Sequence, residues 1–212
     1  MSKLTNINYN YMNWGPFLMK TKVPEYITNK LKADGKKAKK LYNYSLAGHL
    51  KNQFLYNNDT QKWFYEEIQP IFQTYRDGHC KYHGIEKFDV ELEADDLWVN
   101  FMKTGDFNPI HTHGADYSFV LFVDIPKALQ KEQKEFEGTS AKPGTLIFEY
   151  AQPARPRWAT TGITINPEPG DMYIFPALLQ HWVCPFKSKV TRISVSGNLR
   201  ITNRDQLPKG YF

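Results

Sequence analysis

The second half of the chain is a series of short segments with the composition of β-strands, and this series limits the fold more than any other feature. The segments are rich in β-branched and aromatic residues, with Gly, Pro, Asn or Asp between them. They are DVELEAD (89–95), LWVNFMK (97–103), YSFVLFVDI (117–125), TLIFEY (145–150), GITINP (162–167), MYIFPA (172–177) and TRISVSGNLRI (191–201). Strands spaced in this way favour an all-β sandwich or barrel over βαβ units. We therefore predict a mainly β fold of the jelly-roll type.

Residues 1–88 differ from the β half in their residue pattern, and we interpret them as mainly helical and irregular. Residues 24–33 (PEYITNKLKA) begin with a proline and place apolar residues near helical spacing. Residues 60–77 (TQKWFYEEIQPIFQTYRD) repeat apolar residues at steps of three to four, which is typical of an amphipathic helix that Pro70 kinks or interrupts. We expect one structural domain, with a helical N-terminal layer (1–88) packed on a β core (89–212).

The excess of positive over negative charge is confined to the first quarter of the chain. The 212 residues carry a net charge of +5, but residues 1–50 hold nine Lys and two acidic residues (9 − 2 = +7), which leaves 5 − 7 = −2 for the rest. A nucleic acid is thus weakly indicated as a partner, and only for the lysine-rich segment 30–40; a solvated face is the plainer interpretation.

The cysteine count and the apolar runs bear on location. Cys80 and Cys184 are too few for a disulfide scaffold, which favours free thiols in a reducing compartment. The N-terminus has no apolar centre typical of a signal peptide, and no apolar run reaches membrane-spanning length. We therefore expect a cytoplasmic protein without a membrane partner.

Three histidines in the β half form a candidate metal site. His111 and His113 belong to the triplet HTH, and residues i and i+2 of an extended segment project from the same face. His181 is 68 residues further on (181 − 113), and a jelly roll can bring strand ends so separated to one mouth. Two close histidines and one distant histidine are typical of a mononuclear metal site.

The last predicted strand adds a candidate carboxylate receptor. In TRISVSGNLRI, apolar and polar residues alternate, so that Arg192 and Ser194 share a face with other polar residues. A solvent-facing stripe is the simpler interpretation. However, Arg192 follows His181 by 11 residues, and its planar fork matches a carboxylate. Such a receptor beside a metal indicates a metal-chelating ligand with a second acid group.

Four stretches of the β half together resemble a known family. They run from LWVNFMKTGDFNPIHTHGADYSFVLFVDIP (97–126) and GTLIFEY (144–150) to PGDMYIFPALLQHWVCPF (169–186) and RISVSGN (192–198). They resemble the Fe(II)/2-oxoglutarate-dependent oxygenases of the prolyl-4-hydroxylase-like branch, and more closely small oxygenases of cyanobacterial tailed phages. The resemblance implies a double-stranded β-helix with iron at its mouth. It also implies a hydroxylase that uses Fe(II), 2-oxoglutarate and O2, with an unidentified peptidyl or small-molecule substrate.

The resemblance assigns His111 as the first iron ligand and His181 as the distal one, but it leaves the third ligand open. Family members usually carry a carboxylate, HxD or HxE, where this chain has His113. Three arrangements follow: His113 coordinates directly, Asp116 supplies the carboxylate, or water or co-substrate fills the position. We favour the three-histidine site.

The resemblance also implies the co-substrate contacts. Arg192 would pair with the distal carboxylate of 2-oxoglutarate, with Ser194 assisting. Asn100 and Tyr173 are further candidates for co-substrate contact, against the competing interpretations of a strand-edge hydrogen bond and a core tyrosine.

Two other classes of function compete with an oxygenase. One is a non-enzymatic cupin-like or virion-associated β-domain that keeps the fold and a metal without turnover. The other is nucleic-acid binding through the basic N-terminus. Arg192 with Ser194 favours the enzyme, because a site that only binds metal needs no carboxylate receptor. If the gene is carried by a phage, the location becomes the host cytoplasm. The oligomeric state is not readable from the sequence.

Overall fold

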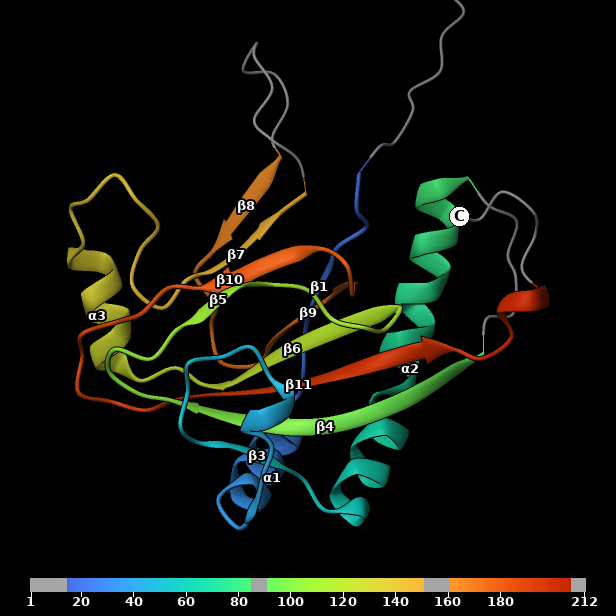
Figure 1. Ribbon diagram of the computed structural model, residues 1–212, viewed down its shortest axis with the longest axis horizontal. Helices are drawn as coiled ribbons and strands as arrows, with labels where there is room; N and C mark the ends of the chain where they lie inside the picture. Colours follow the sequence, from blue (N-terminus) through green and yellow to red (C-terminus); the bar gives the residue numbers. More distant parts are fainter. Residues whose placement is uncertain (1–14, 85–90, 151–160, 207–212) are drawn as a thin grey trace, which may run out of the picture.

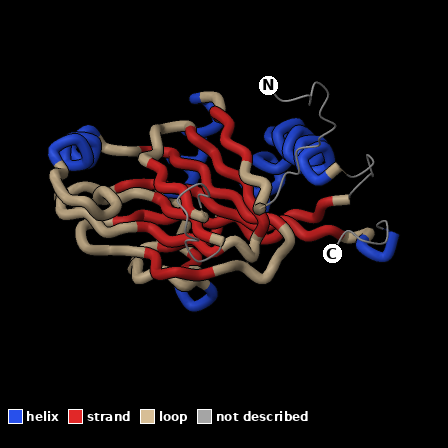
Figure 2. The backbone as a smooth tube through the Cα atoms, turned by 90° about the horizontal axis from the view of Figure 1, so that it is seen from above, coloured by secondary structure: helices blue, strands red, loops and turns tan. Residues whose placement is uncertain are grey.

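Two antiparallel β-sheets face each other and form the body of the protein. The computed structural model describes residues 15–84, 91–150 and 161–206. Within these ranges one sheet has the strand order β1-β9-β6-β11-β4-β3-β2 and the other β5-β10-β7-β8. Figure 1 shows the smaller sheet above the larger one, and Figure 2 shows the helices at the periphery of the strands. This arrangement confirms the prediction of a mainly β jelly roll with N-terminal helices.

The strands and helices have the following bounds. The strands are β1 Met19–Lys22, β2 Lys40–Leu41, β3 Gln53–Leu55, β4 Leu92–Met102, β5 Asn108–His111, β6 Tyr117–Asp124, β7 Leu146–Glu149, β8 Gly162–Ile165, β9 Asp171–Pro176, β10 Gln180–Val183 and β11 Arg192–Ile201. The helices are α1 Glu25–Gly35, α2 Asn58–His83 and α3 Lys127–Glu135, with 3₁₀ turns η1 Asn43–Ser45 and η2 Arg204–Gln206. None of the helices in the described ranges has the length and apolar character needed to cross a membrane.

The N-terminal region contributes strands as well as helices. β1 pairs with β9 at one edge of the large sheet, and β3 pairs with β4 near the other edge. The sequence predicts a mainly helical and irregular N-terminal region, and these short strands are an addition to it. These strands are two to four residues long, too short for a periodic pattern, and it is pairing with distant strands that stabilises them.

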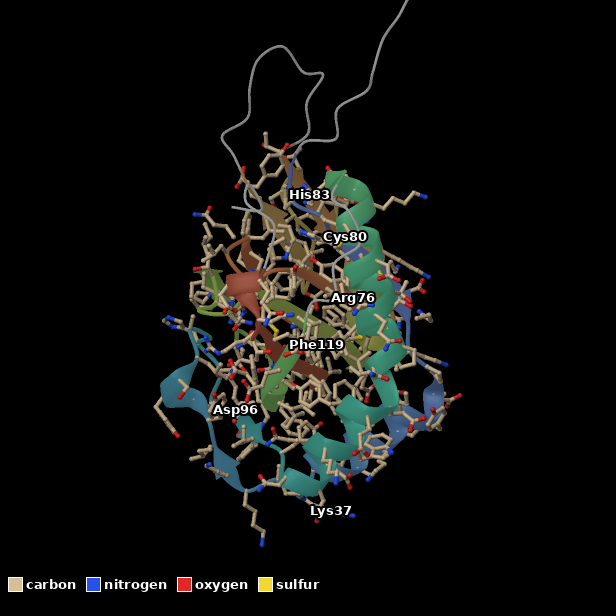
Figure 3. The ribbon with its side chains drawn as sticks, turned by 90° about the vertical axis from the view of Figure 1, so that its right-hand side faces the viewer. Lys37, Arg76, Cys80, His83, Asp96 and Phe119 are labelled. Atoms are coloured by element: carbon tan, nitrogen blue, oxygen red, sulfur yellow. The ribbon has the colours of Figure 1, made fainter. Side chains whose placement is uncertain are left out.

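Helix α2 packs along the outer face of the large sheet (Figure 3). Asn57 caps its N-terminus by accepting a hydrogen bond from the Thr60 backbone N–H at 2.8 Å, and Gly84 ends it with φ 65° in the left-handed region. The helix passes through Pro70 without a break, so of the two predicted alternatives, a kink or an interruption, the interruption does not occur. Large buried side chains on both sides of the proline hold the helix on the sheet: Phe64, Ile68, Phe72 and Tyr75.

The last strand, β11, has the predicted alternation of apolar and polar side chains, and this alternation directs its polar side chains to the candidate site. Ile193, Val195 and Leu199 of β11 enter the core beneath the helices. Arg192 and Ser194 point the other way, into the space between the two sheets, where they line a cavity. β4 beside β11 alternates as well: Val99 packs into the core beneath the helices, whereas Asn100 lines the same cavity as Arg192.

Several elements differ from the sequence-based expectation. The segments 89–95 and 97–103 form one strand, β4, and residues 89 and 90 lie outside the described residues. α3 was not predicted, and β5 and β10 were not among the strand segments identified in the sequence, although the candidate histidines were placed in an extended segment and at strand ends. β5 and β10 span only four residues each and contain proline or histidine, so they lack the run of β-branched and aromatic residues that marks the other strands. α3 is strongly polar, and only Leu129 and Gln133 of it are buried.

Candidate active site

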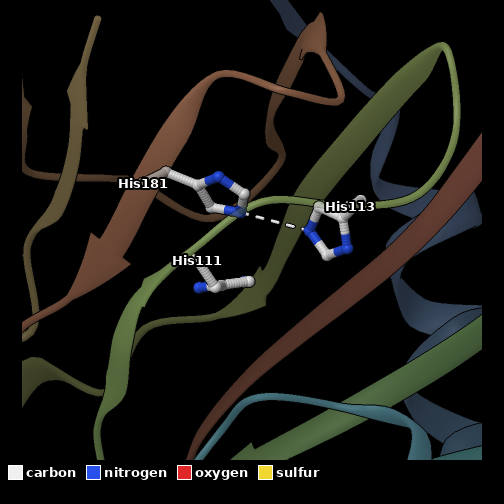
Figure 4. Close-up of side chains that lie close together, drawn as sticks. All are labelled: His111, His113 and His181. Atoms are coloured by element: carbon white, nitrogen blue, oxygen red, sulfur yellow. Dashed lines mark hydrogen bonds between the residues drawn. The ribbon is translucent and has the colours of Figure 1, made fainter.

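Neighbouring strands β5 and β10 bring the three candidate histidines together. His111 at the end of β5 lies opposite His181 of β10 in antiparallel register. His113 follows the end of β5, and its backbone N–H donates to the Ala177 carbonyl at 2.9 Å. One ligand atom from each histidine lies within 4.8 Å of the other two. Figure 4 shows the three rings gathered around one space.

Backbone carbonyls fix the tautomers of two of these rings. Nδ1 of His111 lies 2.8 Å from the Pro109 carbonyl oxygen, and Nδ1 of His181 lies 2.8 Å from that of Leu179. A carbonyl only accepts hydrogen bonds, so each Nδ1 carries the proton and each Nε2 keeps its lone pair. Nε2 of His181 lies 3.2 Å from Nε2 of His113 (Figure 4). Imidazoles oriented in this way are typical of metal ligands.

Burial keeps the three imidazoles neutral. Burial, and to a lesser degree the neighbouring His111, lowers the pKa of His181 to about 3 and that of His113 to about 4. The pKa of His111 is also lowered by burial, with the Pro109 hydrogen bond acting against this. Neutral imidazole is the form that binds a metal ion, so the cluster is ready to bind one near neutral pH without losing protons.

Asp116, the alternative third ligand, is engaged elsewhere. Its Oδ2 accepts a hydrogen bond from the Ile201 backbone N–H at 2.8 Å, at the end of β11. Its carboxylate does not belong to the group of potential ligands formed by the histidines. The geometry therefore favours His113 over Asp116 as the third ligand.

Arg192 is buried in the same region, and the described residues supply no counter-charge to it. The residue is 2% exposed, and Nη1 donates to the Gly144 carbonyl at 2.9 Å. Its guanidinium lies over the Phe122 ring at 5.4 Å, and its buried Nε has no hydrogen-bond partner among the described residues. Burial lowers its pKa to about 10, and no charged group in the described part of the chain offsets this. A buried cation in this state lacks an anionic partner.

One cavity joins the histidines to the arginine. It holds about 710 Å³ of empty space, part of it open to solvent. Among the side chains that line it are those of His111, His113, His181, Arg192, Ser194, Ser196, Asn100, Gln53, Asn108 and Trp98. Asn100 is 5% exposed, and its Nδ2 donates to Ser196 Oγ at 3.3 Å and more weakly to Ser194 Oγ at 3.5 Å. The structure thus brings together six of the seven residues proposed from the sequence.

Tyr173 is the seventh, and it does not line the cavity. It is 3% exposed in the core between the sheets, and Lys20 Nζ lies 5.6 Å from the centre of its ring. Its position therefore favours the core-tyrosine interpretation.

Sequence reasoning missed the contribution of the N-terminal region to this cavity. Gln53 of β3 and residues 45–48 line it from this region, and Asn108 of β5, which lies beyond the region, lines it beside them. Gly48 lets the loop approach closely, because an added Cβ would lie 2.2 Å from Asn108 Oδ1. The HTH triplet pointed to this neighbourhood, but no local pattern marks Gln53, whose place depends on the pairing of β3 with β4.

The double-stranded β-helix, a histidine cluster and an unpaired buried arginine in one cavity define a metal-dependent enzyme that takes an acidic co-substrate. The family model of 2OG-Fe(II) oxygenases matches residues 96–198. The chain belongs to this family, and it is an enzyme that uses Fe(II), 2-oxoglutarate and O2. The residues present fit these groups, with three neutral imidazoles suited to Fe(II) and Arg192 suited to a carboxylate.

Solved structures with a similar fold include several prolyl hydroxylases. A Pseudomonas putida prolyl-4-hydroxylase has a TM-score of 0.53 at 12% identity, covering 87% of this chain and 92% of that one. The viral collagen prolyl hydroxylase of Paramecium Bursaria Chlorella virus-1, in complex with 2-oxoglutarate, has 0.55 at 16%, covering 89% and 98%. A Trichoplax adhaerens prolyl hydroxylase bound to a peptide of hypoxia inducible factor has 0.53 at 9%, covering 86% and 82%. No curated protein matches the sequence.

Proposed function

We propose that this protein is a hydroxylase in which His111, His113 and His181 bind Fe(II) and Arg192 binds the far carboxylate of 2-oxoglutarate. Iron, co-substrate and O2 supply the oxidising chemistry, in which 2-oxoglutarate is decarboxylated to succinate and a C–H bond of the substrate is hydroxylated. The residues of the chain hold and orient these groups and exclude water. Ser194 and Asn100 assist at the co-substrate.

The observation that carries the proposal is Arg192, which is buried in the same cavity as the histidines and has no acidic partner within residues 15–84, 91–150 and 161–206. Burial of an unpaired cation is costly, so such a group is retained where a ligand supplies the opposite charge. A site that only stores metal has no use for it. Together with the family match, this favours an enzyme over a non-enzymatic β-domain.

A three-histidine site changes the charge at the metal. Relative to a site with one carboxylate, a neutral imidazole from His113 leaves the centre one unit more positive. We infer a raised Fe(III)/Fe(II) potential and slower loss of Fe(II) by oxidation.

For the substrate we propose a peptide or a small molecule. Two proteins of similar fold are described as a collagen prolyl hydroxylase and as a prolyl hydroxylase bound to a peptide of hypoxia inducible factor. These likenesses support a peptidyl side chain as the first class to screen.

Succinate formation tests the proposed reaction. The full chain, loaded with Fe(II) and given 2-oxoglutarate in air, should form succinate, faster with a true substrate in a peptide screen. Because many oxygenases consume some co-substrate without a prime substrate, a slow basal rate is expected. No succinate from iron-loaded, folded protein under any substrate condition would exclude the proposed function.

A further inference from the structure

Gln53 enters the cavity from outside the region that defines the family. It begins β3 and lies opposite Asn100 of β4 in antiparallel register, whereas the family match covers residues 96–198. The side chain is 2% exposed, and its Nε2 donates to Asn100 Oδ1 at 2.7 Å. This is a short, fully buried hydrogen bond between two amides that line the same cavity.

The hydrogen bonds continue from Asn100 to β11 with a defined direction. Since Asn100 Oδ1 accepts from Gln53, its Nδ2 faces β11, where it lies 3.3 Å from Ser196 Oγ and 3.5 Å from Ser194 Oγ. A serine oxygen that accepts a hydrogen bond is free to donate its own proton elsewhere. Ser194 is two residues from Arg192 on the same face of β11, so its proton can be directed to an anion beside the guanidinium.

The other atom of the Gln53 amide also indicates a ligand. Its Oε1 is buried and, among the described residues, has no hydrogen-bond partner. Arg192 Nε and Asn108 Oδ1 are likewise buried and have no hydrogen-bond partner among the described residues, and all three residues line this one cavity. Buried polar atoms are rarely left unpaired, so their concentration here marks the space that a ligand occupies.

We propose that Gln53 is a positioning residue for the co-substrate: it fixes the orientation of the Asn100 amide, so that Ser194 donates to the carboxylate held by Arg192. This inference rests on the proposed function. It gives the N-terminal strand β3 a role in the co-substrate site, in addition to the β core that the family match covers.

The substitution Gln53→Glu tests the direction of the chain of hydrogen bonds. A carboxylate only accepts, so the Asn100 amide must turn to donate Nδ2 to it. Asn100 Oδ1 then faces β11, and Ser194 donates to this oxygen instead of to the co-substrate. Gln53→Met removes the hydrogen bond without imposing the opposite direction or adding a charge, so it should have the smaller effect.

Gln61 provides a matched control. It is also a glutamine of the N-terminal region bonded to β4, with Nε2 donating to the Tyr56 carbonyl at 2.8 Å and Oε1 accepting from the Leu97 N–H at 3.3 Å. It does not line the cavity. Gln61→Glu therefore adds the same charge beside the same strand without reversing any hydrogen bond in the site.

The experiment is an anaerobic titration of the Fe(II)-loaded full chain with 2-oxoglutarate, followed by the visible charge-transfer absorption of the chelate. Gln53→Glu should raise the dissociation constant for 2-oxoglutarate by about tenfold or more, the loss expected for one hydrogen bond to a charged group. Gln53→Met should raise it by a smaller factor, and Gln61→Glu by less than about twofold. The KM for 2-oxoglutarate should rise in parallel, while kcat at saturating 2-oxoglutarate changes little.

A double-mutant cycle separates positioning from general damage. If Gln53 acts through Ser194, the effect of Gln53→Met should largely disappear in the Ser194→Ala background. An unchanged effect there, a dissociation constant for Gln53→Glu within twofold of wild type, or equal weakening by Gln61→Glu would overturn the inference. Should Gln53→Glu fail to fold, Gln53→Met and the cycle decide alone. A wild-type protein without any 2-oxoglutarate band would instead refute the proposed function.

Discussion

Replacing Arg192 with leucine should separate co-substrate binding from folding. Burial lowers the pKa of this guanidinium to about 10, which corresponds to a cost of roughly 3 kcal/mol for the charged form. Leucine removes that cost and also removes the hydrogen bond to the Gly144 carbonyl, a loss of about 1–3 kcal/mol. The two effects offset, so the free energy of unfolding of the ligand-free protein should change by less than about 2 kcal/mol.

Binding of 2-oxoglutarate should respond far more strongly. Removal of one partner of a buried, hydrogen-bonded charge pair costs about 2–5 kcal/mol, or about 30-fold to several-thousand-fold in the dissociation constant. Urea unfolding measures the first quantity, and calorimetric titration of the iron-loaded protein measures the second.

Arg200 on the same strand is the control for this substitution. It is exposed, and its Nε lies 2.8 Å from Asp95 Oδ2. Arg200→Leu should leave 2-oxoglutarate binding unchanged, because it removes the same side chain at a distance from the cavity. If Arg192→Leu binds 2-oxoglutarate within about threefold of wild type, the arginine is not the carboxylate receptor and the reasoning fails.

Three further predictions follow from the site. His113→Ala should weaken Fe(II) binding, measured by equilibrium dialysis, more than about 100-fold, whereas Asp116→Asn should leave it unchanged. Strong weakening by Asp116→Asn and none by His113→Ala would assign the third ligand to Asp116. Below pH 6.5 the unfolded chain binds protons that the buried histidines do not, since the pKa of His181 is about 3 in the folded protein. The metal-free protein should therefore lose stability as the pH falls from about 6.5 toward 3. Added Zn²⁺ should raise the melting temperature of the protein at pH values above 6.5 but not near pH 3. Equal melting temperatures of the metal-free protein at pH 7 and pH 5 would refute this. Gly48→Ala should displace Asn108, because the added Cβ would lie 2.2 Å from Asn108 Oδ1. Turnover should fall at least several-fold while iron still binds. Unchanged turnover would show that the loop is free to move aside.

The periodicity of β11 was sufficient to predict its orientation. A strand that alternates between apolar and polar residues has only one way to bury its apolar face, so Ile193 and Val195 had to face the core and Arg192 the opposite side. The short strands β1, β2, β3, β5 and β10 span only two to four residues, too few for such alternation to be recognised in the sequence. Apart from β2, which pairs with nearby β3, they pair with strands far away in the sequence, and local propensity is too weak to indicate this pairing.

Residue type and spacing predicted most of the candidate site. The two histidines of the HTH triplet and the distal His181 converge because β5 and β10 are neighbours, an arrangement that the jelly roll supplies. The engagement of Asp116 with the backbone of β11 could not be read from the sequence. Nor could the insertion of Gln53, since a glutamine in a three-residue strand carries no signal of function.

A crystal structure of the protein with Fe(II) and 2-oxoglutarate, grown without O2, tests the central claim most directly. The account predicts iron bound by His111, His113 and His181, with the far carboxylate of 2-oxoglutarate on Arg192. Iron coordinated by Asp116 in place of His113, or a co-substrate carboxylate that does not contact Arg192, would contradict it.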